Sequence, residues 1–305
     1  DIAVEETPDF IHLDLTLSAG ENCCRVVVKG THTNVVELYI NGQPQPLSEK
    51  QNTSTQRETL PTFSLQQAYD FINRVDFNDI RFILDAARLN SALAAEGKTK
   101  KYGLNINGTF SDAVKNGLMS NDLLSKVIIN TVAASDARMG GAPVVAMSNF
   151  GSGNQGITAT MPVVVVAEHL GVDEETLARA LSLSHLTAIS IHSRYTRLSA
   201  LCAASTAAMG AAAGMAWLFT RDINTINTAI INMVSDITGM ICDGASNSCA
   251  MKVSSVVSSA FKAVLMAMQN SCAGANDGIV CADGFLIPDA LINLVDGKYF
   301  ALIFH

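Results

Sequence analysis

The sequence predicts an α+β protein, in which a small antiparallel β-rich part precedes a mainly α-helical domain. Apolar residues alternate with polar ones up to about residue 48, as they do in half-buried strands. From Ser64 onward the apolar residues recur at helical spacing instead. The apolar fraction is 49% and the aromatic fraction only 6%, so small aliphatic side chains must fill the core, which favours closely packed helices.

Three or four antiparallel strands are expected between residues 8 and 48. Polar and apolar residues alternate from Ile11 to Thr16, and Asn41-Gly42 is a tight-turn signal after a β-branched run. Because so few strands leave one face of a sheet uncovered, we interpret residues 1–62 as the β-rich part of a truncated α+β domain. The polar, proline-containing stretch 43–63 is typical of a linker.

Residues 63–305 are predicted to form an all-helical domain. Ser64 is a favourable N-cap for the first helix, and Asp173 is one for a later helix with two glutamates in its first turn. Gly97 and Gly171 are expected to end two of the helices. The expected helical segments are residues 65–75, 77–96, 112–131, 162–170, the stretch after Asp173, 198–218, 223–240 and 250–268.

Charge and cysteine content limit the classes of partner and compartment. With 28 acidic and 20 basic residues the net charge is −8 at pH 7, and the chain lacks the basic stripe that binds a nucleic acid backbone. The best apolar candidate for a membrane span, residues 203–219, is rich in alanine and glycine, as expected of a buried helix. Seven cysteines, an odd number, and a sequence without a signal-peptide pattern favour a reducing cytoplasm over a disulfide framework.

Two polar, glycine-rich stretches, Ser135–Gly141 and Ser148–Gly156, stand close together in an apolar region. Such loops expose backbone N–H groups and short hydroxyls at a helix N-terminus, which suits a carboxylate or a phosphate. The candidate ligand-binding residues are Ser135, Arg138, Ser148, Asn149, Ser152 and Asn154. Arg138 would clamp a carboxylate with two hydrogen bonds, unless an ordinary ion pair with Asp136 or another acid neutralises it.

Four cysteines fall between residues 242 and 281. Cys242 and Cys249 border a loop with Gly244 and Asn247, and Cys272 and Cys281 follow. The tight Cys-x-x-Cys pairs of zinc sites are absent from the sequence, whereas widely spaced cysteines on loops also hold iron–sulfur clusters. The alternative for each cysteine is a small buried hydrophobic residue.

The candidate acids and bases are His169, His185, His192 and Lys252. A histidine in an apolar segment is more often hydrogen-bonded in the core than catalytic. A lysine near a buried site acts as a base when desolvation lowers its pKa, and is otherwise a surface cation. We take His185 and Lys252 as the catalytic candidates.

Three motifs closely resemble the bacterial L-cysteine desulfidase family, which is similar in turn to the alpha chain of iron–sulfur L-serine dehydratases. They are Ser135–Gly141, Gly151–Thr160 and Gly239–Ala245, and the resemblance runs from about residue 25 to about residue 280. It implies an oxygen-labile 4Fe–4S cluster that is held by three cysteines and leaves one iron open to substrate. It also implies that a small amino acid, L-cysteine, is split into sulfide, pyruvate and ammonia.

The resemblance further implies roles for particular residues. Cys242 matches a cluster-ligand position, and a further ligand is implied downstream, for which Cys281 is our choice and Cys249 the runner-up. The family's first cluster cysteine lies in a Gly-Cys-Thr-Glu-Pro motif before the point where this chain begins, and nothing in the sequence matches that motif. We therefore expect cluster binding to depend on the complete protein. Assembly into a homo-oligomer stays open.

Three other interpretations stay open. The protein could instead be an L-serine or L-threonine dehydratase-like lyase, or a truncated helical scaffold without catalytic activity. The Ser-Gly-Asn-x-Gly core of the second loop is also similar to the phosphate-side loop of PLP-dependent β-eliminating enzymes, with Lys126 as the nearby lysine. Those enzymes have a doubly wound α/β fold, so the predicted helical domain favours the iron–sulfur interpretation.

Overall fold

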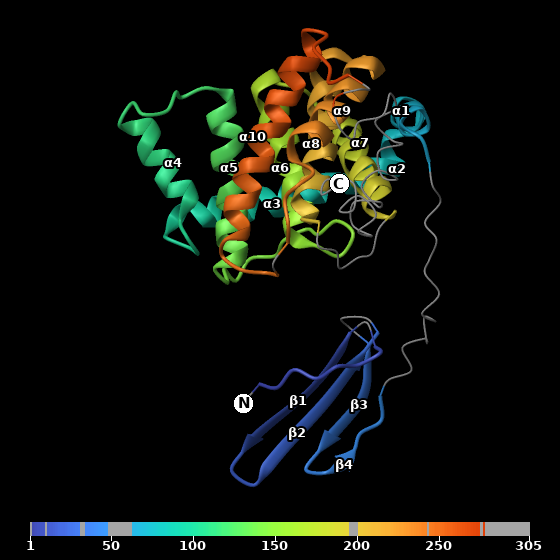
Figure 1. Ribbon diagram of the computed structural model, residues 1–305, viewed down its shortest axis with the longest axis vertical. Coiled ribbons are helices and arrows are strands. Elements are labelled where there is room, and N and C mark those ends of the chain that lie inside the picture. Colours follow the sequence, from blue (N-terminus) through green and yellow to red (C-terminus); the bar gives the residue numbers. More distant parts are fainter. Residues whose placement is uncertain are drawn as a thin grey trace, which may run out of the picture. The chain divides into compact units, whose positions relative to one another are not determined.

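The computed structural model describes residues 2–9, 11–30, 34–47, 63–194, 201–242, 244–274 and 277. The chain divides into two compact units, residues 1–60 and 61–305, which we call the sheet unit and the helical unit (Figure 1). Strands occur in the sheet unit and helices in the helical unit, so the α+β class is confirmed.

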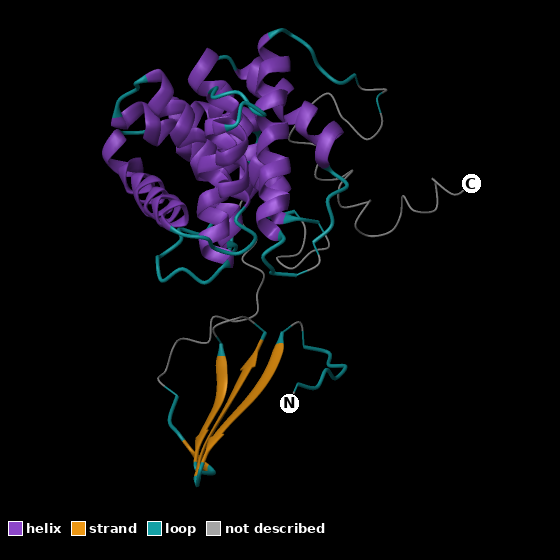
Figure 2. Cartoon of the chain, turned by 90° about the vertical axis from the view of Figure 1, so that its left-hand side faces the viewer, coloured by secondary structure: helices purple, strands orange, loops and turns teal. Residues whose placement is uncertain are grey.

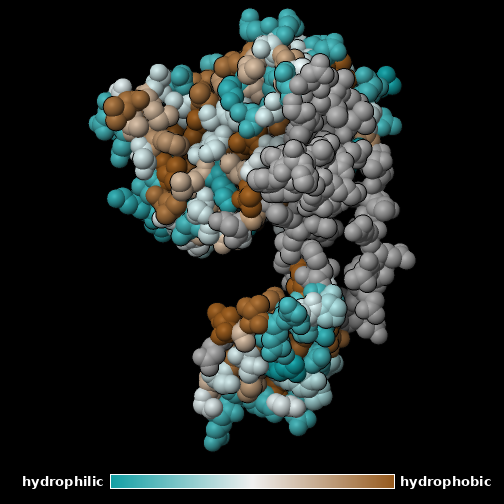
Figure 3. Space-filling model, viewed as in Figure 1, coloured by the Kyte–Doolittle hydropathy of each residue, from teal (hydrophilic) through white to brown (hydrophobic). Residues whose placement is uncertain are grey.

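The sheet unit contains a four-stranded antiparallel sheet with the order β1-β2-β3-β4 (Figure 2). Its strands are β1 (His12–Ala19), β2 (Asn22–Lys29), β3 (Val35–Ile40) and β4 (Gln43–Pro44). In the register Leu15 pairs with Val26, which pairs with Leu38, so one face of the sheet is apolar. Leu15 on this face is 60% exposed, and apolar residues reach the surface of the unit (Figure 3).

The opposite face of the sheet is polar. Arg25 on β2 donates to Asp14 on β1 at 2.6 Å and to Glu37 on β3 at 3.3 Å. These side chains are partly exposed, so the ion pairs fix the register more than they add to the free energy of unfolding.

The helical unit begins with α1 and is built around α8, whose residues from Ala204 to Leu218 are buried. The helix α8 packs against α6, α7, α9 and α10. The helices are α1 (Leu65–Arg74), α2 (Phe77–Ile80), a 3₁₀ turn η1 (Arg81–Ile83), α3 (Leu84–Thr99), α4 (Ile106–Lys115), α5 (Leu123–Met139), α6 (Gly153–Leu170), α7 (Glu174–His192), α8 (Ala203–Thr220), α9 (Ile223–Ile237) and α10 (Cys249–Met268).

Small residues let these helices approach closely. A methyl group at Gly210 of α8 would overlap the carbonyl oxygen of Ser184 on α7, and one at Gly214 would lie 2.8 Å from Val163 on α6. The low aromatic content of the chain therefore has a packing cause, because bulky side chains would separate the central helices.

Several helix ends follow the sequence signals. Ser64 forms a capping box with Gln67 at the start of α1, and the Asp173 side chain accepts a hydrogen bond from the Thr176 N–H at 2.8 Å. Gly171 ends α6 with a φ of 65°, a left-handed conformation that glycine adopts at little cost.

Other helix boundaries differ from the sequence prediction. The expected helix 77–96 consists of α2, η1 and α3, and α3 continues past Gly97 because that glycine serves packing: a methyl group there would overlap the backbone of Ala133 on α5. The expected helix 112–131 is interrupted between α4 and α5, and Asp122 starts α5 by accepting from the Ser125 N–H at 2.9 Å.

The helix α6 also starts earlier than expected, at Gly153, so half of the second glycine-rich stretch is helical. Ser152 caps it, accepting from the Gln155 N–H at 3.3 Å. Gly156 is required because its backbone lies directly on the Met147 carbonyl, where a methyl group would overlap the oxygen.

Within the described residues, α10 is the one helix long and apolar enough to cross a membrane, and half of its apolar window is buried in the protein. It packs against α5, α8 and α9. Its apolar character is therefore explained by its place in the core of the helical unit.

Candidate functional site

Arg138, in the last turn of α5, lies across the N-terminus of α6. A methyl group on Gly153, the first residue of α6, would overlap Nε of Arg138. Burial lowers the pKa of Arg138, while the nearby Cys249 thiol group opposes that shift. Among the described residues no carboxylate pairs with Arg138, so its half-buried charge is available to an anion.

Asp136 does not neutralise Arg138, so that alternative is wrong. Its Oδ2 accepts from the backbone N–H and from the side-chain amide of Asn107, at 2.9 and 3.1 Å. Burial raises the pKa of this carboxyl group, and the Asn107 hydrogen bonds oppose the rise. Asp136 therefore caps the start of α4 and leaves Arg138 to face the other side of α5.

The second polar stretch forms a tight turn before α6. Asn149 and Ser152 exchange backbone hydrogen bonds at 3.1 and 3.0 Å. The two central residues, Phe150 and Gly151, have φ values of 48° and 84°, as in the turns that close two-residue hairpins. The turn delivers the chain into α6 so that the first N–H groups of that helix open beside Arg138.

Two of the polar candidate residues, one from each stretch, are in contact. Ser135 donates to Asn154 Oδ1 at 3.2 Å, and the Asn154 amide lies 3.3 Å from the Met139 sulfur. These two side chains join the end of α5 to the first turn of α6. Ser152 is used as the helix cap, and Ser148 is exposed at the edge of the turn.

A buried series of side-chain hydrogen bonds holds the turn in place. Each group in the series donates in the same direction, because the amide oxygens and the Gly156 carbonyl can only accept. The series begins at His192, whose Nδ1 donates to Gln155 Oε1 at 2.6 Å, and Gln155 Nε2 donates in turn to Asn149 Oδ1 at 2.8 Å. Asn149 Nδ2 then donates to His185 Nδ1 at 2.9 Å, and His185 Nε2 donates to Thr160 Oγ1 at 3.0 Å. The series ends where Thr160 Oγ1 donates to the Gly156 carbonyl at 2.7 Å.

His185 is consequently a neutral ring with both nitrogens engaged. It is 7% exposed, and burial lowers its pKa to about 4. Its contacts hold Asn149 and Thr160 in place. His192 lies at the other end of this series of hydrogen bonds, and its ring is 4.7 Å from that of Phe150 with the two planes tilted by 40°, whereas His169 is exposed in the last turn of α6.

Two cysteines, Cys242 and Cys249, lie within electrostatic range of a third, Cys202, and Cys249 is also within electrostatic range of Arg138. The N-cap residue of α8, Cys202, donates its backbone N–H to the Met240 carbonyl at 3.0 Å, which brings it beside the strand-like segment that leads to Cys242. Cys202 is buried, which raises its pKa, and the thiols of Cys242 and Cys249 lie within electrostatic range of it. Sequence reasoning missed Cys202 because it stands alone before an alanine-rich helix.

The loop between Cys242 and Cys249 faces the end of α5. Gly103 lies close to Asn247 of this loop: a methyl group on Gly103 would be 3.1 Å from Asn247 Oδ1. Gly103 in turn lies against the end of α5, since a methyl group on Gly140 would be only 2.6 Å from the Gly103 backbone nitrogen. The Cys249 sulfur accepts from the Ser246 N–H at 3.4 Å. Lys252 Nζ donates to the Ile241 carbonyl at 2.9 Å and lies within electrostatic range of Cys202.

The remaining cysteine candidates separate from this group. Cys272 follows the far end of α10, which at 1.5 Å per residue lies roughly 30 Å from Cys249. Cys281 lies outside the described residues. In the described ranges, no three His, Cys, Asp or Glu side chains converge closely enough to bind a single metal ion.

The donor set nevertheless fits an iron–sulfur cluster. Cys202, Cys242 and Cys249 share one neighbourhood, and thiolates are the ligands such clusters take. A four-iron cluster is wider than a single ion, so its cysteines stand farther apart. Arg138 places positive charge near the Cys249 thiol, which favours an anionic group there.

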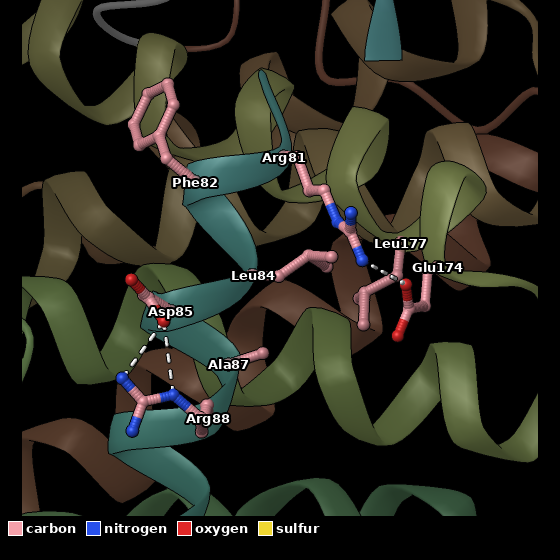
Figure 4. A pocket seen from close by; sticks show the side chains of 8 residues that line it. All are labelled: Arg81, Phe82, Leu84, Asp85, Ala87, Arg88, Glu174 and Leu177. Atoms are coloured by element: carbon pink, nitrogen blue, oxygen red, sulfur yellow. Dashed lines mark hydrogen bonds and ion pairs between the residues drawn. The ribbon is translucent and has the colours of Figure 1, made fainter. Parts of the chain in front are cut away.

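A surface hollow of about 590 Å³ lies elsewhere, between η1, α3 and α7 (Figure 4). Arg81 pairs with Glu174 at 3.8 Å, and Arg88 pairs with Asp85 at 3.0 Å. None of the candidate site residues lines this hollow, and its two arginines are paired with carboxylates.

An all-helical unit that combines a cation at a helix N-terminus with nearby thiols has groups that can bind a small anion. The chain belongs to the serine dehydratase alpha chain family, which matches residues 34–286. It is 99% identical over 283 residues to a UPF0597 protein of Klebsiella pneumoniae subsp. pneumoniae, a match that covers 93% of this chain and 67% of that protein.

More distant relatives agree with this membership. The UPF0597 protein YhaM of Escherichia coli O139:H28 is 55% identical over 280 residues, which covers 90% of this chain and 63% of the relative. YhaM of Shigella sonnei has the same identity and coverage. The chain thus spans about two thirds of the length of the curated relatives it matches.

Proposed function

We propose that the helical unit of this chain carries the substrate site of a lyase that eliminates sulfide from L-cysteine, with pyruvate and ammonia as the final products. The observation that carries the proposal is the position of Arg138, a half-buried cation that lies against the N-terminus of α6 and within electrostatic range of the Cys249 thiol. A substrate carboxylate at Arg138 would place the β-carbon and its sulfur toward the cysteine group.

The residues of α5 and α6 would bind the amino acid. Arg138 supplies charge-assisted hydrogen bonds to the carboxylate, and the first N–H groups of α6 add the positive end of the helix dipole. Ser135 and Asn154, which already bond to each other, lie on the same two helices and would complete the polar lining.

The thiols would hold the cluster. Cys242 and Cys281 are the predicted ligands, with Cys249 as the runner-up, and the electrostatic proximity of Cys202 to Cys242 and Cys249 supports Cys202 as a further candidate donor. Cys281 stays a prediction. When bound, an open iron supplies a Lewis acid for the leaving sulfur.

Proton transfer is assigned to Lys252, which lies beside the thiols rather than in the core. A neutral Lys252 would take the α-proton while the C–S bond breaks and sulfide leaves. The aminoacrylate that results tautomerises, and water hydrolyses it to pyruvate and ammonia. His185 acts at a distance, by orienting Asn149.

The alternatives differ in what supports them. The family match equally suits an L-serine or L-threonine dehydratase, since hydroxide in place of sulfide requires the same β-elimination. The PLP interpretation loses support, because Lys126 is exposed on α5 and the described residues from 63 onward form helices. A cytoplasmic location agrees with an oxygen-labile cluster and stays part of the proposal.

The test is anaerobic reconstitution with iron and sulfide, applied to this chain and to the longer Klebsiella relative. We expect the longer relative to become a brown protein that releases sulfide and pyruvate from L-cysteine faster than it releases pyruvate from L-serine. Faster turnover of L-serine or L-threonine would reassign the substrate. A colourless, inactive product from both proteins would favour the scaffold, and a yellow protein without iron would favour PLP.

A further inference from the structure

Asn90, on α3, bonds to both backbone polar groups of Met147, just before the turn at residues 149–152. Its Oδ1 accepts from the Met147 N–H at 3.0 Å, and its Nδ2 donates to the Met147 carbonyl at 3.3 Å. A single side-chain amide thereby satisfies both polar groups of one loop residue, as a neighbouring strand would do. Asn90 is 0% exposed, so it touches no substrate itself.

Met147 anchors the turn to the neighbouring helices α3 and α6. It directly precedes Ser148 and Asn149, and its carbonyl is in close contact with Gly156 in the first turn of α6. A shift of Met147 would therefore move the turn and the N-terminus of α6 together. Both carry groups that the proposed function places around the substrate carboxylate.

Asn90 also reaches the buried chain of hydrogen bonds. Its Nδ2 lies 3.3 Å from Thr160 Oγ1, which accepts from His185 and donates to the Gly156 carbonyl. The Asn90 amide thus joins two supports of the turn: the backbone at Met147, and the series of side-chain hydrogen bonds that passes from Thr160 through His185 to Asn149. No other described side chain is bonded to the backbone of Met147.

We propose that Asn90 is a positioning residue, which sets the geometry of residues 147–153 for binding the amino-acid substrate. This inference rests on the proposed function, because it gives the turn a substrate to bind. It differs from a purely structural role in one respect. Loss of stability alone lowers the amount of folded enzyme and leaves KM unchanged, whereas a displaced turn weakens substrate binding in every folded molecule.

The experiment compares Asn90→Ala with Ser91→Ala in the reconstituted protein. Ser91 is the next residue of α3 and faces Met161 of α6, so it controls for changes at the same helix interface. We expect Asn90→Ala to raise KM for L-cysteine about tenfold, because a displaced turn no longer orients the groups that bind the carboxylate, with a smaller change in kcat. Ser91→Ala should leave KM unchanged.

Amide hydrogen exchange provides a readout that needs no activity. In Asn90→Ala the amides of residues 147–153 should exchange at least tenfold faster, while those of α8 keep their protection. If Asn90→Ala does not fold, Asn90→Ser, which keeps one small polar group, carries the same expectation. Unchanged KM together with unchanged exchange at residues 147–153 would overturn the proposal. Should the protein have no lyase activity, faster exchange confined to the turn would still separate the role of Asn90 from the failure of the proposed function.

Discussion

The amide of Asn149 donates to Nδ1 of His185 at 2.9 Å, and this bond orients both side chains. The Asn149 oxygen is left to accept from Gln155, and the second ring nitrogen of His185 is left to donate to Thr160. The only arrangement that satisfies all four groups keeps the ring neutral. The turn before α6 therefore depends on a histidine that stays uncharged.

That dependence predicts an acid-sensitive stability. The folded pKa of His185 is about 4 against 6.5 for the free side chain, so the unfolded chain binds more protons between these values. The contribution is fully present above pH 6.5 and is lost as the pH falls toward 4, to a total of about 3 kcal/mol. Urea titrations at several pH values should show this slope, and His185→Gln should flatten it. An equal slope in the variant would contradict the assignment.

Arg138→Ala tests the anion site. Loss of a charge-assisted contact should cost about 1.5–3 kcal/mol, or about ten- to a hundredfold in kcat/KM. Arg88→Ala is the matched control, because Arg88 is exposed and already paired with Asp85. The measurement is steady-state kinetics with L-cysteine. A normal kcat/KM in Arg138→Ala would make the arginine structural.

Gly153→Ala should act on the same site without removing a charge. The added methyl group would overlap Nε of Arg138, whose flexible side chain must move aside. We expect kcat/KM to fall while the melting temperature holds or rises, since alanine is the better helix former. Gly239→Ala has open space around it and serves as the control. Full activity in Gly153→Ala would show that the position of Arg138 is unimportant.

The cysteines should separate by iron content. Cys242→Ser and Cys202→Ser are expected to lose the reconstituted cluster, because each removes a thiolate donor from one neighbourhood. Cys272→Ser, beyond the far end of α10, should retain it. Iron and acid-labile sulfide per chain give the result. Retention of the cluster by Cys202→Ser would remove that residue from the ligand set.

Features set by neighbouring residues were predictable from the sequence. The strand β1, the caps at Ser64 and Asp173 and the left-handed end at Gly171 all follow local rules, and the structure confirms them, although every residue of β1 is exposed rather than alternately buried. The position of Arg138 beside an anion-binding loop was also predictable, because glycine-rich loops that precede a helix have a recognisable local composition.

Features set by distant contacts were missed. Gly97 resembles a helix stop, yet it is fixed by Ala133 on another helix. Asn90 lies in an ordinary helical segment and becomes notable only where α3 meets Met147. Cys202 gains its neighbours from the pairing of Leu201 with Ile241, forty residues away in the chain. Periodicity and motifs carry none of this information, because it arises when the helices pack.

The contact between Gly210 and Ser184 has a consequence for how the site can vary among related proteins. Ser184 directly precedes His185, and α8 begins beside Cys202, so one helix spans the distance between the cysteines and the chain that orients Asn149. Any side chain at position 210 would push α7 away from α8 and widen that distance. The spacing between the cysteines and the residues that orient Asn149 thus depends on the absence of a side chain at position 210. We expect related proteins to keep glycine at this position, even where the neighbouring alanines are replaced by other residues.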